Sequence, residues 1–216
     1  MKLKLTVAWS LMYAVCLGQV PGRVLLQGDF HQEDSAHIVQ SYVQAQKAVE
    51  QMYNAMNAIW NASPQSGKSK MEVRAERWRN DATFMKWLGE PGKMKLVAKN
   101  IRKIHRKFDK KFILEVVKED EGRCNRFVGA WAVPYGRVKM RLCRNYLNFR
   151  TDQSSKILIH EVGHETGMLF HKDLFSCRDV LQAAAAGSDE AKRSPETYAW
   201  LAMSYMGLDC FSRGRF

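Results

Sequence analysis

The segment KILIHEVGHETGMLFHKD, residues 156–173, places two histidines four positions apart, at His160 and His164. On a helix of 3.6 residues per turn these imidazoles project from the same face about one turn apart, as two ligands of one metal ion must. Glu161 lies beside them and supplies a carboxylate that can take a proton from a metal-activated water. The spacing therefore predicts a helix and carries the HExxH signature of a zinc hydrolase.

The residues around the motif support a helix. The apolar run at positions 157–159 favours a buried helix, and Gly167 suits a helix stop just after the second histidine. Two other interpretations of the motif remain. One is an ordinary exposed helix that carries two histidines, and the other is a structural zinc site, which uses four protein ligands and has no need of Glu161.

The spacing leaves the third metal ligand open. In the metzincin pattern a third histidine follows the second by six residues, but here that position is Phe170 and the histidine is His171. A slip of one residue rotates a side chain by about 100° on a helix. Asp173 lies nine residues after His164, far enough for the chain to turn and bring a carboxylate back to the metal. Both His171 and Asp173 are therefore candidates.

The motif and three further segments resemble the aspzincins, the family of deuterolysin and the lysine-specific metalloendopeptidases. In chain order these further segments are FMKWLG at 84–89, AWAVP at 130–134 leading to MRLC at 140–143, and ETYAWLA at 196–202. They occur in the order in which the family has them and together span about residues 84 to 202. Only HExxH is specific by itself.

This resemblance implies a zincin-like domain with one catalytic Zn²⁺ held by His160, His164 and Asp173. It also implies that Glu161 is the general base in peptide-bond hydrolysis. Besides Cys16 the chain has four cysteines, which permit three pairings. The resemblance implies that Cys124 pairs with Cys143, which leaves Cys177 with Cys210.

The chain also departs from the family pattern. Ser176 stands where the family has a tyrosine thought to support the transition-state oxyanion, so His171 and Ser176 are the candidates for that role here. The lysine-specific members share an acidic pair on the last resembling helix. Glu196 keeps one of these acids while Ala199 occupies the other position, so Glu196 is a candidate for selecting basic substrate side chains.

The first 18 residues are typical of a cleaved secretory signal peptide. Lys2 and Lys4 precede an apolar run at 5–17 that ends before the small residue Gly18. A retained membrane anchor is the alternative interpretation, but the run is short for a membrane span, and we expect no transmembrane segment in the mature chain. The four remaining cysteines suit secretion. We expect residues 19–216 to form a single domain, which acts as a monomer outside the cell.

Hydrophobic periodicity predicts a mostly helical α+β fold with a small antiparallel sheet and an HExxH helix. The expected helices cover residues 35–60, 69–88, 97–108, 180–186 and a last segment capped by Ser194. The expected inner face of the first helix comprises Ile38, Tyr42, Ala45, Val49, Met52, Met56 and Ile59, which recur at steps of three and four. The expected inner face of the second helix comprises Met71, Ala75, Trp78, Ala82 and Met85. The expected strands cover residues 112–117, 126–133 and 137–143, the last two forming a hairpin. Thr151 or Asp152 is expected to cap the HExxH helix.

The excess positive charge lies in one region. Residues 68–111 contain 15 lysines and arginines against 5 acids, whereas the rest of the mature chain has 17 of each. Such a surface could attract anionic surfaces, glycans, nucleic acid or acidic proteins. The plainer interpretation is a solvated helix face. No zinc-finger, RNP or Gly-rich phosphate motif accompanies the charges.

Two hypotheses follow. The first is a secreted zinc metalloendopeptidase that cuts protein or peptide substrates, with Glu161 as its base. The second is a secreted zinc-containing binding protein, an inactive protease homologue or effector, which uses the basic helices and holds zinc with His171 as a fourth ligand.

Overall fold

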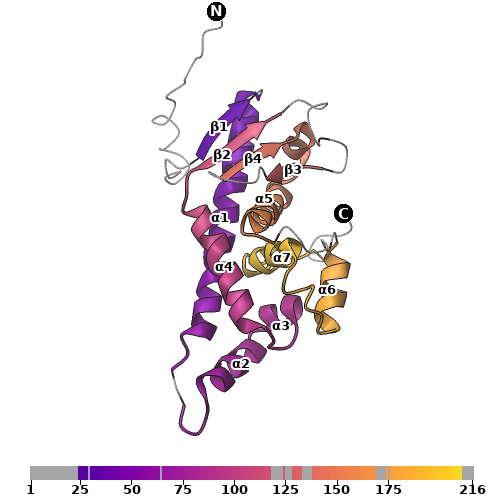
Figure 1. Cartoon of the computed structure of the whole chain (residues 1–216). Helices are drawn as coiled ribbons and strands as arrows, with labels where there is room; N and C mark the ends of the chain where they lie inside the picture. The colour runs from indigo at the N-terminus through magenta and orange to yellow at the C-terminus, as the bar shows by residue number, and fades with distance from the viewer. Residues whose placement is uncertain are drawn as a thin grey trace, which may run out of the picture.

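Helix α1 (Gln32–Trp60) runs along most of the molecule, with the sheet at one of its ends and the smaller helices toward the other (Figure 1). This computed structural model describes residues 24–28, 30–63, 65–117, 124, 128–132, 138–168, 174 and 176–210. The proposed signal segment lies outside these residues. The predicted inner face of the first helix is confirmed, since none of its members is more than 5% exposed: Ile38, Tyr42, Ala45, Val49, Met52, Met56 and Ile59.

The other elements surround α1 in chain order. The helices are α2 (Lys70–Asn80), α3 (Ala82–Leu88), α4 (Met94–Phe108), the 3-10 helix η1 (Arg144–Asn148), α5 (Thr151–Glu165), α6 (Cys177–Ala185) and α7 (Pro195–Tyr205). The strands are β1 (Val24–Gly28), β2 (Phe112–Val116), β3 (Ala130–Ala132) and β4 (Val138–Leu142). The α+β class is therefore confirmed.

The sheet is mixed, so the expectation of an antiparallel sheet is wrong. The strand order is β1-β2-β4-β3, and only the β3–β4 pair is antiparallel, while β2 runs parallel to both of its neighbours. The predicted hairpin supplies the antiparallel pair. It leaves the other edge of β4 free, and β2 pairs with that edge in parallel. The crossover through α1 to α4 joins β1 to β2, which also pair in parallel.

The expected single helix over residues 69–88 is divided in two. The side chain of Asp81 accepts hydrogen bonds from the backbone N–H groups of Thr83 and Phe84, at 2.9 and 3.0 Å, and so caps the N-terminus of α3. The predicted inner face is wrong at Met71, in the first turn of α2, and at Ala82, the first residue of α3, which are both exposed. Trp78 is buried, as predicted.

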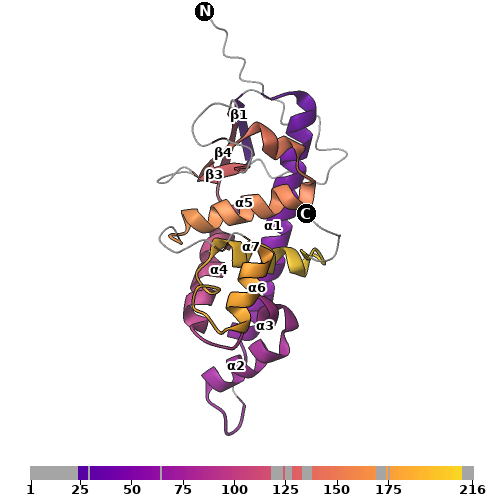
Figure 2. The same cartoon turned by 90° about the vertical axis from the view of Figure 1, so that its right-hand side faces the viewer.

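Helix α5 lies between the sheet and the C-terminal helices α6 and α7 (Figure 2). It packs on α1, α7 and β3. The helix begins at Thr151 with Arg150 as its N-cap residue, so neither Thr151 nor Asp152 is the N-cap. Asp152 lies in the first turn and is paired with Arg150. The helix ends at Glu165, and Gly167 follows with a positive φ of 95°, as expected for a helix stop.

The last two helices follow the predicted pattern. Helix α6 begins at Cys177, three residues before the expected start, and α7 begins with Ser194 as N-cap and Pro195 as its first residue. Within the described ranges, none of the helices is both long and apolar enough to cross a bilayer.

Candidate metal centre

The two histidines of the motif face one another on α5. Their Nε2 atoms are 3.1 Å apart, and their rings meet edge to face with centroids 4.8 Å apart. Two nitrogen ligands of a tetrahedral zinc at 2.0–2.1 Å would lie about 3.3–3.4 Å from each other. His160, Glu161 and His164 each offer a ligand atom, and these atoms all lie within 4.8 Å of one another. The group can therefore hold a metal ion with little rearrangement.

Glu161 is held between α5 and the sheet. The backbone N–H of Ala132, on the outer strand β3, donates a hydrogen bond to Glu161 Oε2 at 2.8 Å. The Glu161 residue is 9% exposed. This bond comes from the sheet, on the opposite side of α5 from α7. It orients the Glu161 carboxylate beside the two imidazoles.

On the other side, Glu196 from the first turn of α7 accepts two hydrogen bonds. Its Oε2 is 2.9 Å from His160 Nδ1, and its Oε1 accepts from Lys156 Nζ at 2.6 Å. Glu196 is only 3% exposed. Because Nδ1 of His160 is bound to a carboxylate, the ring presents its Nε2 toward His164, the arrangement seen in carboxylate–histidine–metal sites.

The charges of this cluster shift the pKa values of both partners. Burial alone would lower the pKa of His160, but its hydrogen bond with Glu196 and the negative charges of Glu196 and Glu161 outweigh burial, so the pKa is raised. Burial raises the pKa of Glu196, but Lys156 and His160 together outweigh it, and the net shift is downward. Glu196 is therefore held as a carboxylate, and the imidazole it orients is more basic than a free one.

A glycine inside the motif lets α7 approach the site. A Cβ atom on Gly163 would lie 2.7 Å from Cβ and 3.1 Å from Cα of Pro195, closer than side chains normally allow. Pro195 is the residue before Glu196, so this contact sets the depth at which the Glu196 carboxylate meets His160. No sequence signal beyond the resemblance of the last helix pointed to Glu196 and Lys156 as partners of the site.

The other predicted site residues lie elsewhere or outside the described residues. His171 and Asp173 belong to the part of the chain that the structure does not describe. Ser176 is the N-cap of α6, where its hydroxyl accepts from the Asp179 N–H at 3.1 Å and donates to the Asp179 carboxylate at 2.7 Å. A role for Ser176 in oxyanion support stays a prediction, as does substrate selection by Glu196, whose two oxygens are both occupied.

Both expected cysteine pairs lie at disulfide distance. The Cα atoms of Cys124 and Cys143 are 5.5 Å apart, and those of Cys177 and Cys210 are 6.4 Å apart. The first pair ties the segment before β3 to the end of β4. The second ties the start of α6 to the residues after α7, next to the helix that supplies Glu196.

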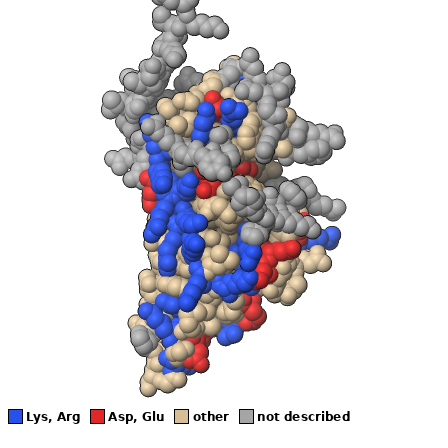
Figure 3. Space-filling view, viewed as in Figure 1, with Lys and Arg blue, Asp and Glu red and all other residues tan. Residues whose placement is uncertain are grey.

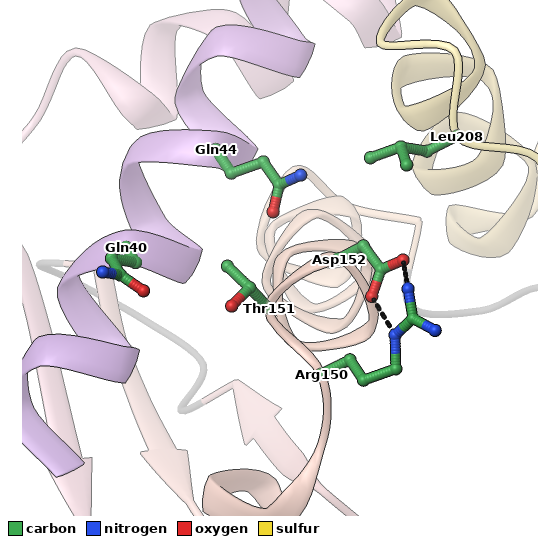
Figure 4. Close-up of a pocket in the computed structure, with 6 residues that line it drawn as sticks. All are labelled: Gln40, Gln44, Arg150, Thr151, Asp152 and Leu208. Atoms are coloured by element: carbon green, nitrogen blue, oxygen red, sulfur yellow. Dashed lines mark hydrogen bonds and ion pairs between the residues drawn. The ribbon is translucent and has the colours of Figure 1, made fainter. Parts of the chain in front are cut away.

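A separate pocket lies at the opposite end of α5 from the histidines (Figure 4). Gln40 and Gln44 of α1 line it together with the start of α5 and Leu208. The charged side chains in its wall, Arg150 and Asp152, are paired with each other at 3.0 and 3.2 Å. This pocket therefore presents neither a metal-binding cluster nor an unpaired charge, and the HExxH group remains the stronger candidate.

No protein-family model matches the chain, and no curated protein matches it.

Proposed function

We propose that this protein is a secreted zinc metalloendopeptidase that resembles the aspzincins. The observation that carries the proposal is the convergence of the two Nε2 atoms of His160 and His164 beside Glu161. The buried contact from Glu196 to the far side of His160 adds to it, because histidines that bind a metal almost always donate their other ring N–H to such a partner. The two cysteine pairs at disulfide distance support secretion.

In this proposal His160 and His164 are two of the metal ligands, and Asp173, outside the described residues, is the third. A bound zinc ion would lower the pKa of an attacking water and would polarise the scissile carbonyl. Glu161 accepts the proton of that water on its carboxylate and later passes it to the leaving amine. The Ala132 N–H keeps the Glu161 carboxylate oriented beside the imidazoles. Glu196 holds Nδ1 of His160 and so keeps its Nε2 facing His164, where the two nitrogens would hold the ion.

The test is the digestion of an unfolded, mixed-sequence protein by the purified mature chain loaded with zinc, read by mass spectrometry. We expect cleavage that is lost with a chelator and lost in Glu161→Gln. The matched control is Glu190→Gln, which removes an exposed glutamate between α6 and α7. Unchanged cleavage in Glu161→Gln would refute the role of Glu161. A folded, zinc-loaded protein that cuts nothing would refute the peptidase.

One observation favours the second candidate, a secreted zinc-containing binding protein that has lost peptidase activity. The residue at the family's tyrosine position, Ser176, has its hydroxyl engaged in capping α6. Its short side chain leaves the oxyanion without the support that the family has. This candidate predicts retention on an anionic partner at physiological salt without any proteolysis.

A further inference from the structure

The outward face of α4 carries a straight row of positive charges. Its members follow one another at steps of four, three and four residues, which keeps them on one face of the helix. They are Lys95, Lys99, Arg102 and Arg106, and we call them the α4 row. Figure 3 shows Lys and Arg side chains gathered in a band over this part of the molecule. At about 1.5 Å per residue the row is roughly 16 Å long.

The α4 row has no acidic partners among the described residues. Lys95, Lys99 and Arg106 are exposed, and no ion pair in the described ranges involves any member of the row. Arg102 lies over the ring of Trp60, 5.2 Å from its centroid. Elsewhere on the surface lysines do find partners, as Lys68 does with Glu76 and Lys93 with Asp189. The row is therefore a set of charges that the described part of the fold does not neutralise.

The row lies on a helix that contacts the HExxH helix. On the side of α4 that faces α5, Lys103 donates to the backbone oxygen of Thr166 at 2.9 Å, and Lys107 Nζ is 3.2 Å from Glu165 Oε2. Glu165 and Thr166 directly follow His164 in the chain. These contacts join the end of the HExxH helix to α4, so the row and the candidate metal centre belong to two helices in direct contact.

The spacing of the row fits an extended peptide. Its charges advance by about 6 Å for a four-residue step and about 4.5 Å for a three-residue step. Alternate side chains of an extended strand point the same way and are about 6.7 Å apart. An acidic segment in extended form can therefore set successive carboxylates against successive cations, and long lysine side chains absorb the remaining mismatch.

We propose that the α4 row is an exosite that binds an acidic, extended segment of the protein substrate while another part of that substrate lies at the metal centre. This inference rests on the proposed peptidase function and names its substrate class, proteins with an acidic stretch beside the cleaved bond. The attraction is between exposed charges, so it weakens as salt rises.

The test uses two peptides with the same cleavable sequence, one flanked by alternating glutamates and one by alternating glutamines. The variant Lys95→Gln/Lys99→Gln/Arg106→Gln removes three charges from the row. The control Lys70→Gln/Arg79→Gln/Arg178→Gln removes the same charge from exposed positions on α2 and α6. Circular dichroism and thermal unfolding establish that both variants are folded.

For the wild type at low salt we expect kcat/KM to be about tenfold higher for the acidic peptide, as a few exposed ion pairs allow. The row variant should bring this ratio close to one, and the control should keep it. Raising the salt to about 0.5 M should also collapse the wild-type ratio. A wild-type ratio near one, or a ratio that the row variant leaves intact, would overturn the exosite.

A binding arm separates this inference from the proposed function. The anisotropy of the labelled acidic peptide is measured with the zinc-loaded wild type and both variants. If neither peptide is cut, the peptidase proposal fails. The row then remains a binding site for an acidic peptide only if the wild type binds the labelled peptide more tightly than the row variant does. If an oligonucleotide or a sulfated oligosaccharide of equal charge binds the row at least tenfold more tightly at about 150 mM salt, the peptide is the wrong partner.

Discussion

At the scale of single residues, the site depends on how His160 is held. An imidazole can present either nitrogen to a metal, and the hydrogen bond made by the other nitrogen decides which one. Here Nδ1 of His160 is bound to the buried Glu196 carboxylate, whose other oxygen is bound to Lys156. Lys156 thus offsets the negative charge that the site would otherwise bury.

Replacing Glu196 with glutamine tests this arrangement. The amide keeps the size of the side chain but removes its charge, so the His160 ring loses basicity and Lys156 is left as an unbalanced cation beside the metal. We expect the affinity for zinc to fall about 10–100-fold, as for other partners of metal-bound histidines. A competition titration with a chelating dye measures it, with Glu190→Gln as the control. Equal affinities in Glu196→Gln and the control would contradict the positioning role.

The sequence predicted the residues of the motif better than their surroundings. His160, Glu161 and His164 share a helix, and their mutual placement depends only on local geometry, so the spacing was enough. The contact of Glu196 with His160 was not predicted, because it arises from the packing of two helices separated by 29 residues of chain. No local pattern reports such a contact.

At the scale of elements, the crossing of α5 and α7 brings the site together. Gly163 presents bare backbone to Pro195, and the next residue of α7 is Glu196. A larger residue at position 163 would push the start of α7 away and lengthen the contact between Glu196 and His160.

We therefore expect Gly163→Ala to weaken zinc binding and lower stability together. Overpacking at such a contact costs about 1–3 kcal/mol, whereas alanine gains about 1 kcal/mol in helix propensity. The net loss in the free energy of unfolding should be about 1 kcal/mol, with zinc affinity reduced severalfold. Urea unfolding and the dye competition measure the two effects.

The matched control is Gly92→Ala, because a Cβ atom there would meet the end of the Lys192 side chain at 3.6 and 3.8 Å and the Glu90 backbone oxygen at 3.9 Å, which are ordinary contact distances. It should leave zinc affinity unchanged. If Gly163→Ala bound zinc as tightly as Gly92→Ala, the close approach of α7 would not be what positions Glu196.

Elements were predictable where one period runs uninterrupted. Helix α1 keeps a single apolar face over its 29 residues, and its buried positions were predicted correctly. The division into α2 and α3 was missed because an aspartate can occupy a helix interior as well as an N-cap. The sequence alone does not show that the Asp81 side chain caps a new helix. The parallel pairing of β2 and β4 was missed because strand sequences do not report the direction of their partner.

At the scale of the whole molecule, the two cysteine pairs hold regions on either side of α5. The pair Cys177–Cys210 closes a segment of 33 residues that contains α6 and α7. It therefore restrains the helix that brings Glu196 to the site.

Removing this pair by Cys177→Ala/Cys210→Ala should lower the free energy of unfolding by about 3–4 kcal/mol, the loop-closure entropy expected for a segment of this length. Urea unfolding without reductant measures the effect, and a reductant should lower the stability of the wild type at least as far as that of the oxidised variant, because it opens both cysteine pairs. A variant as stable as the oxidised wild type would show that the two cysteines are not bonded in solution.

The charge distribution was visible in the sequence, but its geometry was not. Counting charges located the basic region at 68–111, and the structure then divides it into paired lysines and the α4 row, which has no ion-pair partner among the described residues. This division depends on which residues of other helices face α4.

The central claim is that His160 and His164 hold a zinc ion while Glu161 serves as base rather than ligand. Native mass spectrometry of the zinc-loaded wild type, Glu161→Gln and His164→Ala tests it most directly. We predict one zinc per chain in the wild type and in Glu161→Gln, and none in His164→Ala. Zinc retained by His164→Ala, or lost from a folded Glu161→Gln, would contradict the account.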